Sequence, residues 1–161
     1  MLGAAREEGA RTFVVRSGIA YVRSRGGIVR KVVDSAREHG AARYGAPPES
    51  ENNSWTLVHL DELGGLYVRL LEGEAPGGTL LLATSDGSRR AREIAEPASR
   101  AGSADGRIET RPLYEALEKL VDHAYVLALD QRLTSERARR ILDWTPSAPS
   151  VFEELEGGSY S

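Results

Sequence analysis

The chain contains no cysteine, which excludes disulfide bonds and metal sites built on thiolate ligands. Only 6% of its residues are aromatic and the net charge is −3, so the composition offers neither the strong positive charge nor the stacking residues typical of nucleic-acid binding. No apolar run approaches the roughly 20 residues that a membrane span needs. The first residues also lack the apolar segment of a secretory signal. We therefore expect a cytoplasmic protein that binds neither nucleic acid nor membranes.

The remaining composition is that of a globular protein, with 40% hydrophobic and 28% charged residues among 161. A chain of this length can bury one core, so we expect a single domain over residues 1–161. Short apolar runs alternate with segments of helical periodicity, and this alternation predicts an α/β fold.

The periodicity also predicts the individual elements. Buried strands are expected at 12–15, 55–58 and 79–84, and a weaker one at 108–110. Residues 4–8 are expected to be the last turns of a helix, and a second helix is expected from residue 28 to Gly40. Further helices are expected after a cap at Ser88 and from Pro112. Two more are expected after a cap at Thr134 or Ser135 and after a capping box at Ser150 and Glu153. A helix after a cap at Asp61 should bury one apolar stripe, made of Leu63, Leu66, Tyr67, Leu70 and Leu71. Trp55 and Trp144 are expected to pack in the core or at an interface.

Several catalytic motifs are missing from the sequence. No glycine-rich nucleotide loop, phosphate-binding Gly-Lys-Ser/Thr or Gly-x-Ser-x-Gly elbow occurs. Tyr21 is followed four residues later by Arg25, whereas a tyrosine acid needs a lysine there to lower its pKa and exchange protons. His59 lies near two carboxylates, but a zinc site needs three or four converging ligands, and the other histidines are distant in sequence. We assign no catalytic and no metal-binding residue.

Four segments in a fixed order carry a resemblance to a known family. They are Val14-Val15-Arg16-Ser17-Gly18-Ile19-Ala20-Tyr21, Val58-His59-Leu60-Asp61-Glu62-Leu63-Gly64, the strand-like run from Gly78 to Thr84, and the segment from Ser135 to Pro146 with its Trp-x-Pro ending. Together they resemble the carboxyl-terminal half of an extended short-chain dehydrogenase/reductase, of the NAD-dependent epimerase/dehydratase family.

The resemblance implies a partial Rossmann-type fold: the late strands of the sheet plus the small substrate-binding subdomain. It implies NAD or NADP as cofactor, with Ser17, Gly18 and Ile19 meeting the nicotinamide end. It also implies that Tyr21, His59 and Arg132 line the substrate side. The amino-terminal half of such proteins, which carries the glycine-rich turn and the Tyr-x-x-x-Lys, has no counterpart in this sequence.

Some positions depart from the family pattern. Ser17 replaces a proline, Val22 a glycine, and Asp143 the glycine that would close the helix after Thr134 or Ser135. Pro97 falls inside a predicted helix, where it costs about 3 kcal/mol or more if the helix continues through it. Two glycines at 64 and 65 cost about 1 kcal/mol each relative to alanine in a helix.

Three hypotheses follow. The first is a truncated NAD(P)-dependent epimerase, dehydratase or reductase-like protein, the substrate-side half, inactive alone, whose full-length relatives act on small molecules. The second is a non-enzymatic interaction module, in which the strand at 12–15 pairs through an exposed sheet edge with a second copy or with a separate amino-terminal half. The third is phosphate-ligand binding through the arginines near 89–92 and 132–140.

Overall fold

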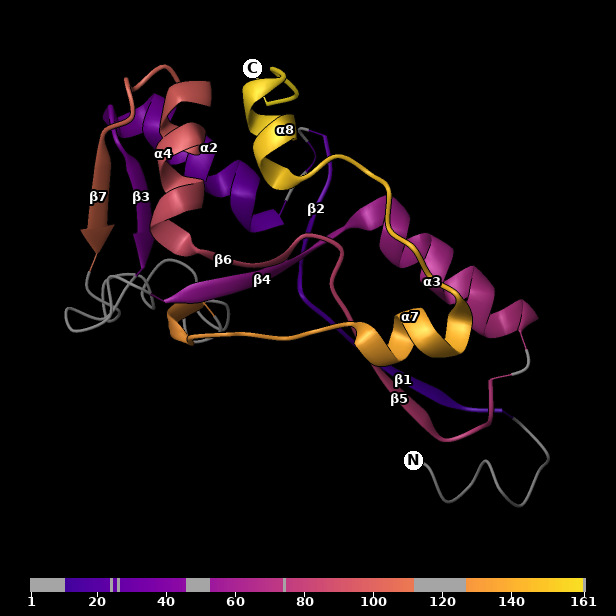
Figure 1. Cartoon of the computed structure of the whole chain (residues 1–161). Coiled ribbons are helices and arrows are strands. Elements are labelled where there is room, and N and C mark those ends of the chain that lie inside the picture. Colours follow the sequence, from indigo (N-terminus) through magenta and orange to yellow (C-terminus); the bar gives the residue numbers. More distant parts are fainter. Residues whose placement is uncertain are drawn as a thin grey trace.

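The computed structural model describes residues 11–23, 25, 27–45, 53–73, 75–111 and 127–160. Strands and helices alternate through them, as Figure 1 shows. The strands are β1 (Phe13–Ser17), β2 (Ile19–Tyr21), β3 (Ala42–Gly45), β4 (Ser54–His59), β5 (Thr79–Ala83), β6 (Gly87–Arg90) and β7 (Ile108–Arg111). The helices are α2 (Gly27–His39), α3 (Leu60–Glu72), α4 (Ala91–Ala101), α7 (Glu136–Leu142) and α8 (Val151–Glu156). The α/β class predicted from the sequence is confirmed.

Three small sheets carry these helices. β1 pairs in parallel with β5, with Phe13 opposite Thr79 and Ser17 opposite Ala83. β4 is the centre of the second sheet, parallel to β2 and antiparallel to β6, and β3 pairs in parallel with β7 in the third. Because β1 and β2 are separated only by Gly18, the chain changes its partner from β5 to β4 within one residue.

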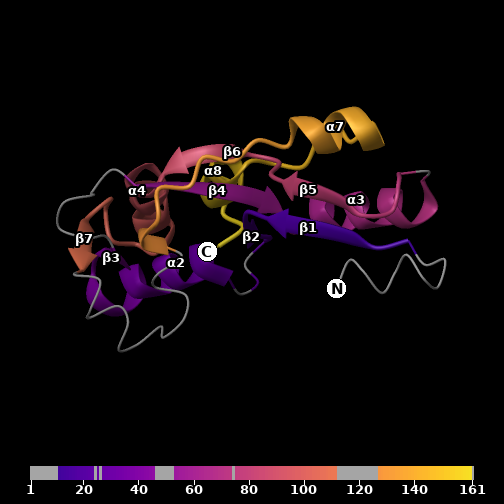
Figure 2. The same ribbon diagram turned by 90° about the horizontal axis from the view of Figure 1, so that it is seen from below.

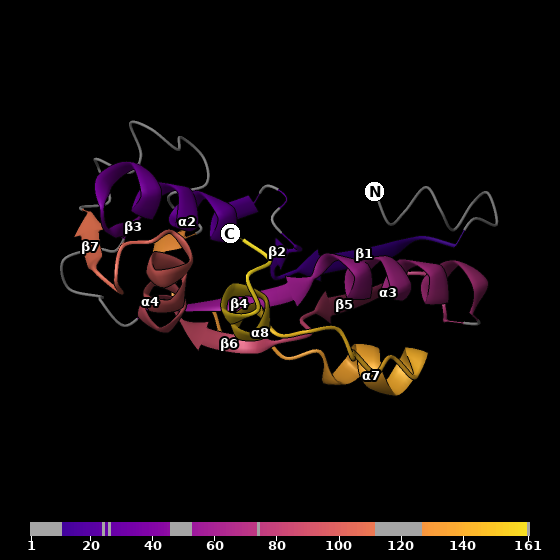
Figure 3. The same cartoon turned by 90° about the horizontal axis from the view of Figure 1, so that it is seen from above.

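The first hydrophobic cluster joins α2, α4 and α8 to β3 and β4. Its largest buried side chains include Tyr44, Trp55 and Tyr160, all under 5% exposed. α2 and α4 lie side by side (Figure 3), and Gly102 at the end of α4 allows the close approach. A Cβ at that position would lie 2.6 Å from both the Ala36 Cβ and the Val33 carbonyl oxygen, so only glycine fits without a shift.

The second hydrophobic cluster joins α3 and α7 to one face of the β1–β5 pair. Leu63, Leu66 and Leu70 of α3 pack with Leu81 of β5 and with Trp144 beyond α7. In Figures 2 and 3, α3 lies over the β1–β5 pair and α7 lies on the β5 side of it. Both tryptophans are therefore core residues, as predicted.

Most predicted elements are confirmed, and three details are corrected. The cap of α3 is His59, two residues before the predicted Asp61, because the His59 Nδ1 accepts the Asp61 N–H. Ser88 lies in strand β6, and α4 starts after Arg90 instead. β2, β3 and β6 were not predicted, and the predicted helices at 4–8 and from Pro112 lie outside the described residues.

The apolar stripe of α3 differs most from the prediction. Leu63, Leu66 and Leu70 are buried, but Tyr67 is 46% and Leu71 is 71% exposed, so the expected burial of Tyr67 and Leu71 is wrong. By contrast, α4 continues through Pro97, which is itself buried. Within the described residues, no helix is long and apolar enough to cross a membrane.

Candidate functional site

The carboxyl ends of β1 and β5 meet at one point of the fold. The Gly18 N–H donates to the Ala83 carbonyl oxygen across 2.9 Å, which fixes the end of β1 beside the end of β5. Ser17 is exposed, Gly18 is buried and Ile19 is half-buried. Ligands of parallel α/β sheets bind outside such carboxyl ends, so this junction is a candidate contact point.

Gly18 is required at this junction by packing. A Cβ there would lie 2.6 Å from the Thr56 carbonyl oxygen of β4, which is closer than real Cβ contacts. The glycine therefore lets the β1–β2 turn press against the backbone of β4.

The hydroxyl of Thr56 fastens a distant segment onto β4. Thr56 is fully buried, and its Oγ1 donates to the Gln131 carbonyl oxygen at 2.9 Å and accepts the Leu133 N–H at 3.2 Å. The same oxygen lies 2.9 Å from the Ser88 hydroxyl of β6. Two residues further along, the Ser135 hydroxyl donates to the Thr84 carbonyl oxygen at 2.8 Å. These bonds place the segment before α7 against β4, β5 and β6.

A pocket of about 320 Å³ opens between this segment and the strand ends. Its lining contains two arginines, four hydroxyl-bearing residues and one carboxylate, namely Arg132, Arg139, Thr84, Ser88, Thr134, Ser135 and Glu136, together with Gly87 and Leu133. Gly87 has a φ of +69°, a left-handed conformation that favours glycine, and its N–H donates to the Thr84 hydroxyl. The pocket can therefore offer hydrogen bonds and positive charge to an anionic ligand.

The two arginines are held differently. Arg139 donates from its Nε to the Ser135 hydroxyl at 3.2 Å, which anchors its guanidinium at the pocket. Arg132 is exposed, and its Nη2 lies 3.3 Å from the Asp130 carboxylate. Hydrogen bonds from Ser54 and the nearby charge of Arg132 hold the pKa of Asp130 below its usual value, so this carboxylate remains charged at neutral pH.

Tyr21 and His59, the other predicted substrate residues, lie inside the fold next to each other. Each is 2% exposed, and their rings meet edge to face with centroids 5.2 Å apart. The Tyr21 hydroxyl donates to the Pro149 carbonyl oxygen at 2.9 Å. Burial, reinforced by the charge of Asp86, raises the pKa of Tyr21 above its ordinary value, which disfavours proton release at neutral pH.

Both ring nitrogens of His59 have partners within the chain. Nδ1 accepts the Asp61 N–H at 3.2 Å, so the ring proton lies on Nε2, which is 3.1 Å from the Glu154 Oε1 of α8. Glu154 is 2% exposed, and its Oε2 has no hydrogen-bond partner among the described residues. His59 thus links the start of α3 to α8. The contact of His59 with a substrate, which the resemblance implies, is still a prediction.

The structure therefore separates the predicted site residues into three places: Ser17, Gly18 and Ile19 at the strand ends, Arg132 in the pocket, and Tyr21 with His59 in the core. The first two places are connected, because Gly18 binds Ala83 and the next residue, Thr84, lines the pocket. Sequence reasoning missed Thr56 and Glu154, since nothing in their local pattern marks a contact with residues 70 or more positions away. Arg139 was named only among the arginines near 132–140, and the structure places it in the pocket lining. In the described part of the chain, no group of three or more His, Asp or Glu residues could hold a metal ion.

Comparisons with known proteins support the same fold. No family model and no curated protein matches the chain. Among solved structures, RMD from Pseudomonas aeruginosa complexed with NADPH matches at 15% identity with a TM-score of 0.67, over 99% of this chain and 52% of that one. The dTDP-glucose 4,6-dehydratase from Bacillus anthracis in complex with NAD matches at 13% identity and a TM-score of 0.71, over 98% and 46%. The UDP-glucose 4-epimerase from Thermotoga maritima with UDP-glucose matches at 14% and 0.66, over 97% and 47%.

The fold of the chain corresponds to about half of each of these enzymes. The chain spans roughly half the length of the solved structures it matches. The predicted partial Rossmann-type fold and the resemblance to NAD-dependent epimerases and dehydratases are thus confirmed at the level of structure.

Proposed function

We propose that this chain is the substrate-side half of an NAD(P)-dependent epimerase, dehydratase or reductase, and that it does not turn over substrate by itself. The observation that carries the proposal is the fold match over nearly the whole chain to about half of each such enzyme. The pocket at Arg132 supports it, because the nucleotide sugars named for two of these neighbours carry a diphosphate, and paired guanidinium and hydroxyl groups suit phosphate.

In this proposal, Arg132 and Arg139 bind the anionic part of the substrate. Tyr21 and His59 form the wall beneath the site: the ring contact and the hydrogen bonds to Pro149 and Glu154 keep the end of β4 in place. This role needs no proton transfer from Tyr21, in agreement with its raised pKa.

The residues present fit only one end of a dinucleotide. Ser17 is exposed at the end of β1, so this turn can touch the nicotinamide end, whereas the Gly18 N–H is already bonded to Ala83. The chain has no glycine-rich turn before a helix to hold the pyrophosphate. NAD or NADP binding therefore requires a second segment, either a longer form of this chain or a separate amino-terminal half, and no chemical step is assigned to the chain alone.

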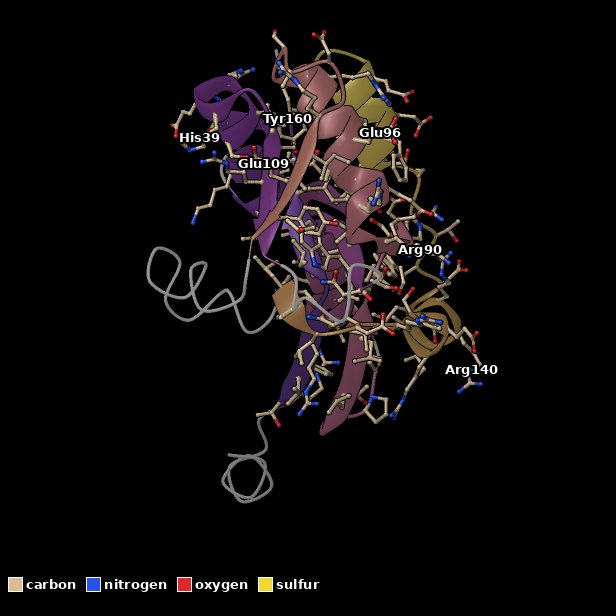
Figure 4. All side chains as sticks on the ribbon, turned by 90° about the vertical axis from the view of Figure 1, so that its left-hand side faces the viewer. His39, Arg90, Glu96, Glu109, Arg140 and Tyr160 are labelled. Atoms are coloured by element: carbon tan, nitrogen blue, oxygen red, sulfur yellow. The ribbon has the colours of Figure 1, made fainter. Side chains whose placement is uncertain are left out.

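Calorimetric titration with UDP-glucose tests the substrate side. Arg132→Gln should weaken binding by on the order of tenfold, since a charged hydrogen bond to phosphate contributes about 1.5 kcal/mol. Arg140→Gln is the matched control, because Arg140 is exposed on α7, outside the pocket lining, and extends away from the fold in Figure 4. Equal effects of the two variants would show that only overall charge matters and would remove the pocket from the proposal.

A turnover assay tests the catalytic side. The chain mixed with NADH or NADPH and a panel of aldehydes and nucleotide sugars should give no enzyme-dependent reaction. Saturable turnover that disappears in Tyr21→Phe would refute the proposal and make Tyr21 a catalytic acid.

The second candidate function, an interaction module that pairs through a sheet edge, is favoured by one observation. Among the described residues, β5 is the sole strand bonded to β1, and the first three residues of β1 are apolar and half-buried. An edge of this kind tends to pair with another chain.

A further inference from the structure

The hydroxyl hydrogens around the pocket have fixed directions. The Thr56 Oγ1 lies 2.9 Å from the Gln131 carbonyl oxygen, which cannot donate, so Thr56 directs its only hydroxyl hydrogen there. The same oxygen accepts the Leu133 N–H at 3.2 Å. Its remaining contact, at 2.9 Å to the Ser88 hydroxyl, is therefore a hydrogen bond that Ser88 donates. Because Thr56 is fully buried, these three bonds use its whole hydrogen-bonding capacity.

This bond makes Ser88 an acceptor toward the pocket. A hydroxyl group has one hydrogen and two lone pairs, and the hydrogen of Ser88 is directed at Thr56. Ser88 is half-buried on β6 and lines the pocket, so it presents lone pairs, and not a hydrogen, to a ligand. A surface serine can rotate its hydroxyl to suit either a donor or an acceptor. Ser88 can do so only by breaking its bond to the buried Thr56.

Two further hydroxyls of the pocket are committed in the same way. The Thr84 hydroxyl donates to the Leu57 carbonyl oxygen at 2.8 Å and accepts the Gly87 N–H at 3.0 Å. The Ser135 hydroxyl donates to the Thr84 carbonyl oxygen at 2.8 Å and accepts the Arg139 Nε–H at 3.2 Å. Both residues are buried, so neither offers its hydrogen to a ligand. The guanidinium groups are therefore the principal donors of the pocket.

The groups that remain for a ligand are of two kinds. The Nε of Arg139 is bonded to Ser135, which leaves its two Nη groups, and such a fork suits the oxygens of a phosphate. Arg132 adds a second guanidinium from the segment that runs alongside β4 to α7 in Figure 1. Ser88 and the Glu136 carboxylate are the acceptors. A ligand that satisfies both kinds carries an anionic group and a hydrogen-bond donor.

The size of the pocket limits how much of a ligand it holds. Its volume of about 320 Å³ lies at the lower end of the range for small-molecule sites, roughly 300–1,000 Å³. This space suits one sugar ring with its phosphate better than a whole nucleotide sugar. The carboxylate of Glu136 also repels a ligand with further negative charges.

We propose that Ser88 determines specificity in this pocket, by accepting a hydrogen bond from a hydroxyl of a sugar whose phosphate binds Arg139 and Arg132. A phosphate ester without hydroxyls satisfies the arginines but supplies no donor to Ser88. A glycosyl phosphate supplies both groups from one small molecule. The inference rests on the proposed function, because it names the part of the proposed substrate that this pocket selects.

Two phosphate monoesters test the proposal, in titrations followed by the amide chemical shifts of the chain. Glucose 1-phosphate has hydroxyl groups and methyl phosphate has none. The wild-type chain should bind glucose 1-phosphate about fivefold to tenfold more tightly, the effect of one hydrogen bond. Ser88→Ala should remove most of this preference and leave the affinity for methyl phosphate unchanged. Equal affinity of the wild-type chain for both esters, or binding of neither, overturns the proposal.

Two further variants separate selection of the ligand from support of the fold. Ser88→Thr retains a hydroxyl that can donate to Thr56, so it should keep the preference for glucose 1-phosphate. Ser147→Ala is the matched control, because Ser147 is exposed and lies outside the pocket lining. If Ser88→Ala weakens both esters equally, Ser88 only supports the structure of the pocket, and the proposal is overturned. A preference that persists in Ser88→Ala overturns it as well.

UDP-glucose distinguishes a failure of this inference from a failure of the proposed function. Binding of UDP-glucose that depends on Arg132, without any preference for glucose 1-phosphate over methyl phosphate, would retain the proposed function and overturn the role of Ser88. A preference that Ser88→Ala removes, without binding of UDP-glucose, would retain the role of Ser88. The ligand would then be a free sugar phosphate, and the proposed function would fail.

Discussion

The buried pair of His59 and Glu154 gives the sharpest prediction about stability. Glu154→Ala removes the group that faces the His59 Nε2–H and leaves that donor unsatisfied in a site where both residues are 2% exposed. An unsatisfied buried donor costs about 1–3 kcal/mol, and removing one partner of a buried pair costs about 3–5 kcal/mol. We expect a loss of about 3 kcal/mol in the free energy of unfolding. For a chain of this size, that lowers the melting temperature by about 6–12 °C.

Two matched variants make the measurement decisive. Glu154→Gln keeps an oxygen that can accept the His59 proton, and the wild-type Oε2 has no partner to lose, so a change of less than about 1 kcal/mol is expected. Glu156→Ala, on the exposed side of the same short helix, should stay within about 0.5 kcal/mol. Urea unfolding followed by tryptophan fluorescence reports all three. If Glu154→Ala costs no more than Glu156→Ala, the buried hydrogen bond does not join α8 to α3 as described.

Three further predictions concern single positions. Gly102→Ala should destabilise the chain by about 1–3 kcal/mol, because its Cβ would meet Ala36 at 2.6 Å, while Gly65→Ala, which meets nothing, should stabilise it by about 0.5–1 kcal/mol in denaturant titrations. Asp143→Gly should raise the melting temperature, since Asp143 ends α7 with a left-handed φ of 47° that costs most residues about 1 kcal/mol relative to glycine. Burial raises the pKa of Tyr160 to about 12. The stabilisation of the fold by the protonated Tyr160 side chain is therefore complete below about pH 10 and is lost as the pH rises through 12. Tyr160→Phe should therefore lose less stability than wild type over that interval; an unchanged alkaline profile would contradict the raised pKa.

The sequence predicted correctly those elements that are determined by interactions between neighbouring residues. The Ser150 hydroxyl accepts the Glu153 N–H and the Glu153 carboxylate accepts the Ser150 N–H, as the capping-box pattern requires. Gly40 follows α2 with a φ of +69°, the conformation for which glycine was expected there. The runs at 12–15 and 79–84 pair in one parallel sheet, because both are short, apolar and bounded by polar segments.

The errors arose where long-range contacts decide the outcome. Periodicity gives the angular width of the apolar arc on α3, but it does not tell which part of the arc the chain covers, so Tyr67 was assigned to the core. The cap of α3 was assigned to Asp61, since aspartate is a common cap, whereas the His59 ring is held in capping position by Tyr21 and Glu154. β6 was missed because Gly87-Ser88-Arg89-Arg90 has no strand pattern and becomes a strand only through pairing with β4.

The pocket and the chemistry of the proposed reaction depend on different parts of the molecule. The residues around Arg132 are held by hydrogen bonds from Thr56, Thr84 and Ser135, all within the described part of this chain. The pyrophosphate cradle and the Tyr-x-x-x-Lys, to which the resemblance assigns cofactor binding and proton transfer, have no counterpart in the sequence. Under the proposed function, we therefore expect binding of a nucleotide sugar without turnover, whereas a chain that is only an interaction module should bind no nucleotide sugar.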